Sequence, residues 1–183
     1  MPKLFSYVVE HDHGFAPNPC DGLCTLAKCK FGSHGWKNIV ELAEKHDWIA
    51  GTGGANLKKS AGHETLIYAM RVDKKIPLAE YCRRYPGRID AEHEKDEDTR
   101  FALVSKHFFY FGRNAITIPR WFREIEKPGP AFKNKFADDF IERFVEWLEG
   151  KWDCGVHGAP CQPASEIRIS LSCKSRSKQK GCK

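Results

Sequence analysis

The chain has 183 residues, of which 41% are hydrophobic and 30% are charged. This length and composition favour one globular domain of ordinary size and exclude a long disordered or fibrous protein. No run approaches the roughly 18 apolar residues of a membrane-spanning helix. The first residues, MPKLFSYVVEHDHG, also lack the apolar core of a signal peptide. The sequence therefore predicts a cytoplasmic protein without a membrane segment.

The net charge of +6 is concentrated at one end of the chain. Five of these charges come from the segment KSRSKQKGCK, residues 174–183, whereas residues 90–98 form an acidic run, DAEHEKDED. A uniformly basic surface for non-specific phosphate binding is therefore not indicated. We predict a single α+β domain over residues 1–173, followed by a basic, disordered tail over 174–183.

Eight cysteines are more than such a chain usually carries. Two clusters of metal-ligand residue types are Cys20, Cys24 and Cys29, and Cys154, His157 and Cys161. Neither cluster has the two complete ligand pairs of a structural zinc site. Without a signal peptide, reduced thiols are favoured over disulfides. We predict reduced cysteines and no metal site, and the sequence identifies no cofactor.

The first half of the chain alternates strand and helix patterns. Residues 4–10, LFSYVVE, favour a strand, and the Pro- and Gly-containing residues 15–24 favour an ordered, irregular loop. Apolar residues at helical spacing predict a helix over 36–46. Residues 47–54 predict a strand that enters a glycine turn, and residues 65–72 predict a second strand that forms a hairpin with it.

The second half begins with a short helix after Pro77, over residues 78–85. The aromatic segment 101–112, FALVSKHFFYFG, favours one core strand. A helix is expected to begin near Asp138, with its apolar face toward the core, and the alternation in 165–172 favours a final strand. Strands interrupted by a few helices indicate an α+β domain with a mainly antiparallel sheet. The predicted core includes Val8, Ile49, Ile67, Met70, Phe109, Phe144 and Leu148.

Six segments, in this order, carry a family resemblance: YVVEHDHGFAPNP, CTLAKCK, DWIAGTGG, YAMRV, FFYFG and NAITIP. Together they resemble the nucleotide modification associated domain 2 family over roughly residues 5–160. The resemblance implies a bacterial or phage protein associated with systems that modify DNA bases. The order of strands and helices is also similar to PUA-related folds of the EVE and ASCH kind, which implies a mainly antiparallel β-barrel or curved sheet with flanking helices.

Two segments depart from the family pattern. Phe31 stands where family members tend to carry proline, and the acidic run 90–98 stands where they carry a GDN-type segment. If that segment contributes to the family's site, this chain has altered part of the site.

The first candidate site residues follow the first predicted strand. Alternation sends His11 and His13 to one face and Asp12 to the other. A histidine pair can transfer protons near neutral pH, and a neighbouring carboxylate can orient an imidazole. His11, Asp12 and His13 are therefore candidate catalytic residues. The alternative is a polar turn in which Asp12 caps backbone amides.

Further candidates offer nucleotide-binding chemistry. Lys28 and Lys30, with the Thr25 hydroxyl, suit a phosphate, and Asn18 can bind a base edge. The alternative leaves the lysines in solvent and Asn18 in a turn.

Thr52 lies in a glycine-containing segment whose amides can approach a phosphate; the alternative is a tight hairpin turn. In the segment 108–111, two aromatic rings are expected to fill the core and two to face a groove, with Tyr110 as the candidate for base stacking.

These residues support three hypotheses. The first is a module that recognises a nucleotide or a modified base in nucleic acid. The second is a nucleotide- or base-modifying enzyme that uses His11, Asp12 or His13 as acid–base groups. The third is an interaction protein of a phage or defence system that has lost the ligand site and binds a protein partner.

Overall fold

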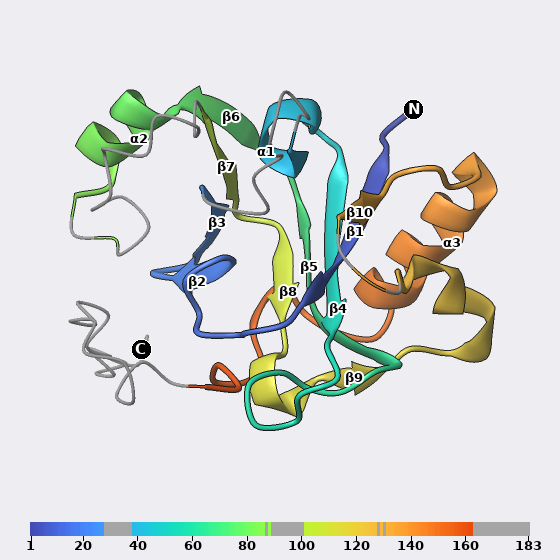
Figure 1. Ribbon diagram of the computed structural model, residues 1–183. Coiled ribbons are helices and arrows are strands. Elements are labelled where there is room, and N and C mark those ends of the chain that lie inside the picture. The colour runs from blue at the N-terminus through green and yellow to red at the C-terminus, as the bar shows by residue number, and fades with distance from the viewer. Residues whose placement is uncertain (28–37, 87, 89–100, 128, 130, 163–183) are drawn as a thin grey trace, which may run out of the picture.

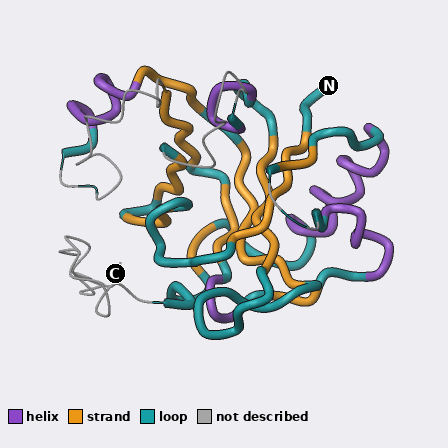
Figure 2. The backbone as a smooth tube through the Cα atoms, in the orientation of Figure 1, coloured by secondary structure: helices purple, strands orange, loops and turns teal. Residues whose placement is uncertain are grey.

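The computed structural model describes residues 1–27, 38–86, 88, 101–127, 129 and 131–162. Within these residues the strands form a seven-stranded sheet and a four-stranded sheet (Figures 1 and 2). The larger sheet consists, in spatial order, of β10 (Phe132–Lys133), β1 (Leu4–Val9), β4 (Trp48–Gly53), β5 (Thr65–Arg71), β8 (Phe108–Tyr110) and β11 (Gly155–Val156), with β9 (Ile116–Thr117) also paired to β5. The smaller sheet consists of β2 (Asn18–Cys20), β3 (Leu23–Leu26), β7 (Phe101–Ser105) and β6 (Lys74–Pro77).

Most strand pairs are antiparallel. The exceptions among the described strands are β1 with β4 and β8 with β11, which run parallel. The described helices are α1 (Ile39–Leu42), α2 (Leu78–Arg84), α3 (Asp138–Glu149) and the two 3₁₀ helices η1 (Gly112–Asn114) and η2 (Arg120–Ile125). The predicted α+β class with a mainly antiparallel arrangement is confirmed. The described strands form two separate sheets and not a closed barrel.

One face of the larger sheet is covered by α3 and η2, on the right of Figure 1. Phe144 and Leu148 of α3 are fully buried there against Phe109 of β8. The ring of Phe122 from η2 meets Phe144 edge to face, with centroids 5.7 Å apart. The helix starts at two acidic residues, which suit the positive end of its dipole, and ends at Gly150.

The opposite face of the larger sheet packs against α1 and the smaller sheet. Leu26 of β3 and Leu103 of β7 join Tyr110, Phe5 and other β-strand residues in this second cluster. Because both faces are covered, Phe108, Phe109, Tyr110 and Phe111 are all buried. The expectation that two of these rings face a groove is therefore wrong, since it assumed a sheet with one open side.

Several predicted elements are confirmed at nearly the expected positions. They are the strands at 4–10, 47–54 and 65–72, the hairpin of the last two, and the helices after Pro77 and Asp138. All seven residues predicted for the core are buried. Each helix among the described residues is too short or too polar to cross a bilayer.

Three elements differ from prediction. Residues 15–24 contain β2 and the start of β3, joined at Asp21 and Gly22, which both have positive φ as in a type I′ hairpin turn. The segment 101–112 is split between two sheets, since β7 pairs with β3 and β8 pairs with β5. At the turn between them the Ser105 hydroxyl forms hydrogen bonds with the backbone of His107.

The helix predicted over 36–46 is reduced, in its described part, to α1, four residues long. Its start is capped by the Asn38 side chain, which accepts a hydrogen bond from the Glu41 amide. Beyond Ala43 the chain is held by Asp47, whose carboxylate accepts from the Glu44 amide. The strand predicted at 165–172 and the tail 174–183 lie outside the described residues.

Candidate functional site

Asp12 lies just beyond the end of β1, and its carboxylate is buried, with 1% of the residue exposed. One oxygen, Oδ1, accepts hydrogen bonds from the Tyr110 hydroxyl at 2.7 Å and from the Gly14 amide at 3.3 Å. The other, Oδ2, accepts from the Cys161 amide at 3.0 Å. A buried carboxylate is stable only with such partners. Asp12 and Tyr110, two of the predicted site residues, are therefore brought into direct contact.

The backbone of Asp12 connects two further segments. Its amide donates to the Lys59 carbonyl at 2.7 Å, and its carbonyl accepts from the Gln162 amide at 2.9 Å. One residue thus joins the end of β1, the loop between β4 and β5, strand β8 and the segment around residue 161. This cluster, formed by Asp12, Tyr110 and Cys161, is called the Asp12 cluster below.

Within the Asp12 cluster, the Cys161 thiol and the Tyr110 hydroxyl stay in their protonated forms. Burial, the charge of Asp12 and the hydrogen bond to it raise the pKa of the Cys161 thiol to about 12. The same three causes raise the pKa of the Tyr110 hydroxyl well above its usual range. At neutral pH both groups therefore remain neutral donors toward the Asp12 carboxylate.

A cleft of about 210 Å³ opens beside this cluster. It is lined by Leu57, Ser60, Ala61, Arg113, Ala115 and Cys161. Arg113 belongs to η1 and is exposed, and its Nη2 donates to the Pro160 carbonyl at 3.3 Å. Ser60 is buried and holds the loop in place, because its hydroxyl donates to the Val9 carbonyl and accepts from the Gly54 amide. The cleft therefore combines a cation, a neutral thiol and apolar side chains.

His11 and His13 lie beside each other at this turn, whereas Asp12 between them is buried. Their rings are 5.7 Å apart between centroids, and His11 is exposed whereas His13 is half-buried. His13 Nδ1 lies 3.4 Å from the Gln162 carbonyl. The carboxylate of Asp12 accepts hydrogen bonds from Tyr110, Gly14 and Cys161, so it connects the end of β1 to strand β8.

Asn18 and Thr25 lie in a different environment, as register partners across the β2–β3 hairpin. Both are buried. The guanidinium of Arg88 donates to the Asn18 carbonyl at 2.8 Å and to the Thr25 hydroxyl at 3.2 Å. The Tyr81 hydroxyl donates to the same Thr25 oxygen at 3.0 Å. The Thr25 hydroxyl thus belongs to a buried network that fastens the hairpin to α2 and the residues after it.

Thr52 is also buried, and its hydroxyl donates to the Tyr7 carbonyl at 3.3 Å. The neighbouring glycines serve the fold: a Cβ at Gly53 would lie 1.9 Å from the Gly62 carbonyl oxygen, so this position requires glycine. Lys28 and Lys30 lie outside the described residues. Among the predicted nucleotide-binding residues that the structure describes, Tyr110 is the one that lies in the Asp12 cluster, and it contributes its hydroxyl because its ring is buried.

The cysteines separate into different environments. Cys20 is disulfide-bonded, so the expectation of reduced thiols is wrong for this residue, whereas Cys24, Cys82, Cys154 and Cys161 are not in disulfides. Of the C-x2-H-x3-C pattern, Cys161 contacts Asp12, whereas His157 stacks on Phe111 and its Nε2 lies 2.8 Å from the Asp153 carbonyl. Within the described ranges, no group of three metal-ligand side chains comes together.

Sequence reasoning missed Arg113 and Arg88, and it considered Cys161 only as a metal ligand. Arg113 had one available signal, because it lies between two of the segments that carry the family resemblance, FFYFG and NAITIP. Arg88 and Cys161 had none, since the Arg88 guanidinium meets Thr25 and the Cys161 amide meets Asp12 across at least 63 residues of sequence.

The chain is thus an α+β protein with two mixed or antiparallel sheets and a polar cluster at the end of its first strand. The profile of nucleotide modification associated domain 2 matches residues 1–89 and 84–167. The chain belongs to this family, as the resemblance predicted.

Two solved structures, both of an ASCH protein from Zymomonas mobilis, are also similar to the chain. A mutant of that protein shares 12% identity with a TM-score of 0.41, and covers 80% of this chain and 99% of its own. The other crystal structure shares 12% identity with a TM-score of 0.40, and covers 79% of this chain and 94% of its own. A comparison with curated proteins found no match.

Proposed function

We propose that the chain recognises a nucleotide or a modified base, free or within nucleic acid, in the cleft beside the Asp12 cluster. The observation that carries the proposal is the presence, at one cleft, of the exposed cation Arg113 and the neutral donor Cys161, the latter fixed by a buried carboxylate. Membership of a family associated with nucleotide modification supports the same class of ligand. The setting would be a bacterial or phage system that modifies DNA bases.

The size of the cleft supports a small ligand. Sites for drug-sized molecules occupy roughly 300–1,000 Å³, whereas this cleft encloses about 210 Å³. A single base or a sugar–phosphate unit fits this volume better than a complete dinucleotide. The apolar atoms of Leu57, Ala61 and Ala115 suit the faces of a flat ring.

Arg113 supplies the polar recognition. A guanidinium has five donors in a planar fork, and binds phosphate or the acceptor edge of guanine through two parallel hydrogen bonds. Its contact with the Pro160 carbonyl involves Nη2 and orients the group at the rim of the cleft.

The protonation states favour recognition over catalysis. A thiol with a pKa of about 12 is almost entirely protonated at neutral pH and is a poor nucleophile. The alternative that the chain is an enzyme places acid–base chemistry on His11 and His13. The observation that favours it is that the rings of these two residues lie next to each other. The interaction-protein alternative depends on the acidic segment 90–98, which lies outside the described residues.

The test is a binding panel read by calorimetry and thermal shift. The panel contains the four deoxynucleoside monophosphates and their 5-methyl, 5-hydroxymethyl and N6-methyl derivatives. We expect at least one ligand to bind, and Arg113→Ala to weaken it by roughly 10- to 150-fold, the value of a hydrogen bond to a charged group.

Arg120→Ala is the matched control, because Arg120 is an exposed arginine that does not line the cleft. It should bind as the unaltered protein does. Mass spectrometry of the same mixtures detects any chemical conversion of the ligand. Conversion that is lost in His11→Ala or His13→Ala would favour the alternative that the chain is an enzyme. Failure of the whole panel would contradict the proposal.

A further inference from the structure

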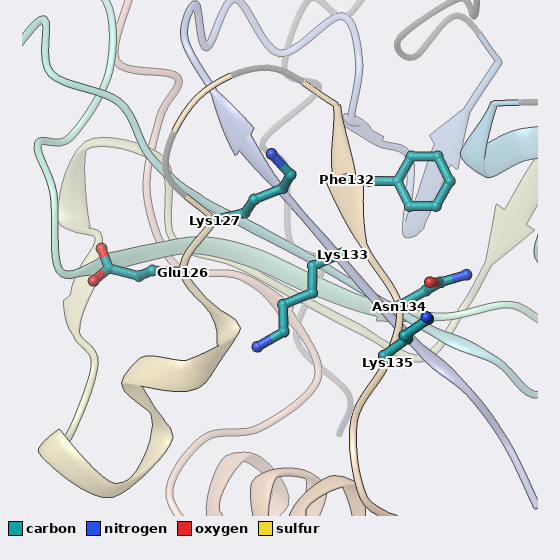
Figure 3. Close-up of a pocket in the computed structure, with 6 residues that line it drawn as sticks. All are labelled: Glu126, Lys127, Phe132, Lys133, Asn134 and Lys135. Carbon is teal, nitrogen blue, oxygen red and sulfur yellow. The ribbon is translucent and has the colours of Figure 1, made fainter. Parts of the chain in front are cut away.

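A second, larger cavity of about 460 Å³ lies along β10, at the edge of the seven-stranded sheet. This cavity is called the basic cavity below. It is lined by Glu126, Lys127, Phe132, Lys133, Asn134 and Lys135. Figure 3 shows Glu126, Lys127 and Lys133 on one side of the strand, and Asn134 and Lys135 on the other. Three lysines against one glutamate give the lining a net positive charge, which suits an anionic ligand.

Lys133 is held in place by contacts with its neighbours at the edge of the sheet. Lys133 Nζ donates to the Glu124 carbonyl at 2.9 Å and to its Oε1 at 3.0 Å, and lies 4.7 Å from the centroid of the Phe136 ring. The ring of Phe132 packs at 6.0 Å from Phe5 of β1. Glu126, the acidic member of the lining, already accepts a hydrogen bond from the Glu64 amide.

An exposed tryptophan lies on η2, the 3₁₀ helix whose Glu124 accepts hydrogen bonds from Lys133. Trp121 of η2 is 67% exposed, which is rare for so large an apolar side chain. In a 3₁₀ helix, side chains three residues apart lie on the same face. Trp121 therefore shares a face of η2 with Glu124, the residue that contacts Lys133 at the basic cavity.

We propose that the basic cavity and Trp121 form a binding surface for single-stranded nucleic acid. Lys127, Lys133 and Lys135 contact successive phosphates, and the indole of Trp121 stacks on a base. A cationic groove beside an exposed aromatic ring is the arrangement that binds single strands, because only an unpaired base offers its face to the ring. This surface shares no residue with the cleft beside the Asp12 cluster, so the two proposals are independent.

The test uses the full chain and fluorescein-labelled oligothymidylate and oligouridylate of about 12 nucleotides, within the usual site size for single strands. Anisotropy titrations at several salt concentrations give the affinity and its salt dependence. Removing two phosphate contacts in Lys127→Ala/Lys135→Ala should reduce the slope of log K against log salt by about 1.4. The comparison of the two oligonucleotides shows whether the surface prefers DNA or RNA.

Trp121→Ala should weaken binding by roughly 5- to 150-fold with an unchanged salt slope, and Trp121→Phe should retain part of the affinity because it keeps a ring. The control Lys45→Ala/Lys74→Ala removes the same charge from exposed positions elsewhere and should leave the slope nearly unchanged. Thermal melting verifies that each variant is folded.

Three results would overturn the proposal. They are no binding of either oligonucleotide, an equal loss of slope in the lysine variant and its control, and full affinity in Trp121→Ala. Binding of oligonucleotides that survives in Arg113→Ala, with no monophosphate bound by any variant, would support this surface and contradict the cleft.

Discussion

At the scale of single residues, Asp12 is the centre of the account. Four segments of the chain meet at it, and its charge adds to the effect of burial in raising the pKa of Cys161 and Tyr110. The sequence pattern His-Asp-His indicated that Asp12 would face away from His11 and His13, because alternation at a strand end is a local property. The identity of its partners is not local, since Tyr110 and Cys161 lie 98 and 149 residues away.

The first prediction concerns Asp12→Asn. Burial and the Asp12 charge both raise the pKa of the Cys161 thiol, so removing the charge should lower that pKa from about 12 toward its ordinary value. Alkylation of Cys161 by iodoacetamide should then begin at a lower pH. Peptide mass spectrometry across a pH series measures this, with Cys154 as the internal control, because its pKa is raised by burial and Glu149 instead. An unchanged Cys161 profile would show that Asp12 does not control the thiol.

The second prediction compares two buried hydroxyls. Tyr110→Phe removes a donor from a charged carboxylate, and should cost about 1–3 kcal/mol of the free energy of unfolding. Tyr7→Phe removes one half of a neutral hydroxyl pair, at 2.8 Å from Tyr68, and should cost about 0.5–1.5 kcal/mol. Urea denaturation of both variants measures the difference. A larger loss for Tyr7→Phe would argue against a charged Asp12.

At the scale of elements, strong local patterns were predictive. The helix at Asp138–Glu149 follows from the spacing of Phe140, Phe144 and Leu148, and the β4–β5 hairpin from two β-rich segments. The Asp21-Gly22 dipeptide is a hairpin-turn signal, whereas the neighbouring prolines favour an irregular loop, and the structure forms the hairpin. The division of residues 101–112 between two sheets depends on tertiary contacts that periodicity does not contain.

The third prediction tests the packing of α3. Phe144 is fully buried against η2 and the sheet, so Phe144→Ala should cost about 3–5 kcal/mol. Glu142→Ala changes an exposed position of the same helix and should remain within about 0.5 kcal/mol of the unaltered protein. Thermal or urea unfolding gives both values, and a cost below about 1 kcal/mol for Phe144→Ala would contradict the packing described.

At the scale of the whole molecule, the sequence predicted the class, the family and part of the core, because these depend on composition, order of motifs and apolar patterning. The candidate cleft was only partly predictable. It requires Arg113 and Cys161 to lie together, and nothing in their sequence separation indicates this. Thr25 and Thr52 carry hydroxyls that suit a ligand, but the fold uses these hydroxyls internally, and Asn18 is buried with its backbone carbonyl bound to Arg88.

The fourth prediction concerns residues 174–183, which supply five of the six net positive charges. This segment has no apolar periodicity, so its deletion should leave the melting temperature nearly unchanged. Oligonucleotide binding should keep its dependence on Trp121 in the shortened protein. A clear drop in melting temperature, measured by differential scanning calorimetry, would assign the segment a structural role.

The most direct measurement of the central claim is a crystal structure of the chain with the tightest-binding monophosphate of the panel. The account predicts a base in the cleft lined by Ala61, Ala115 and Cys161, with the Arg113 guanidinium within hydrogen-bond distance of the phosphate or the base edge. The Asp12 cluster should be unchanged by the ligand. A nucleotide bound at any other place, with the cleft empty, would contradict the account.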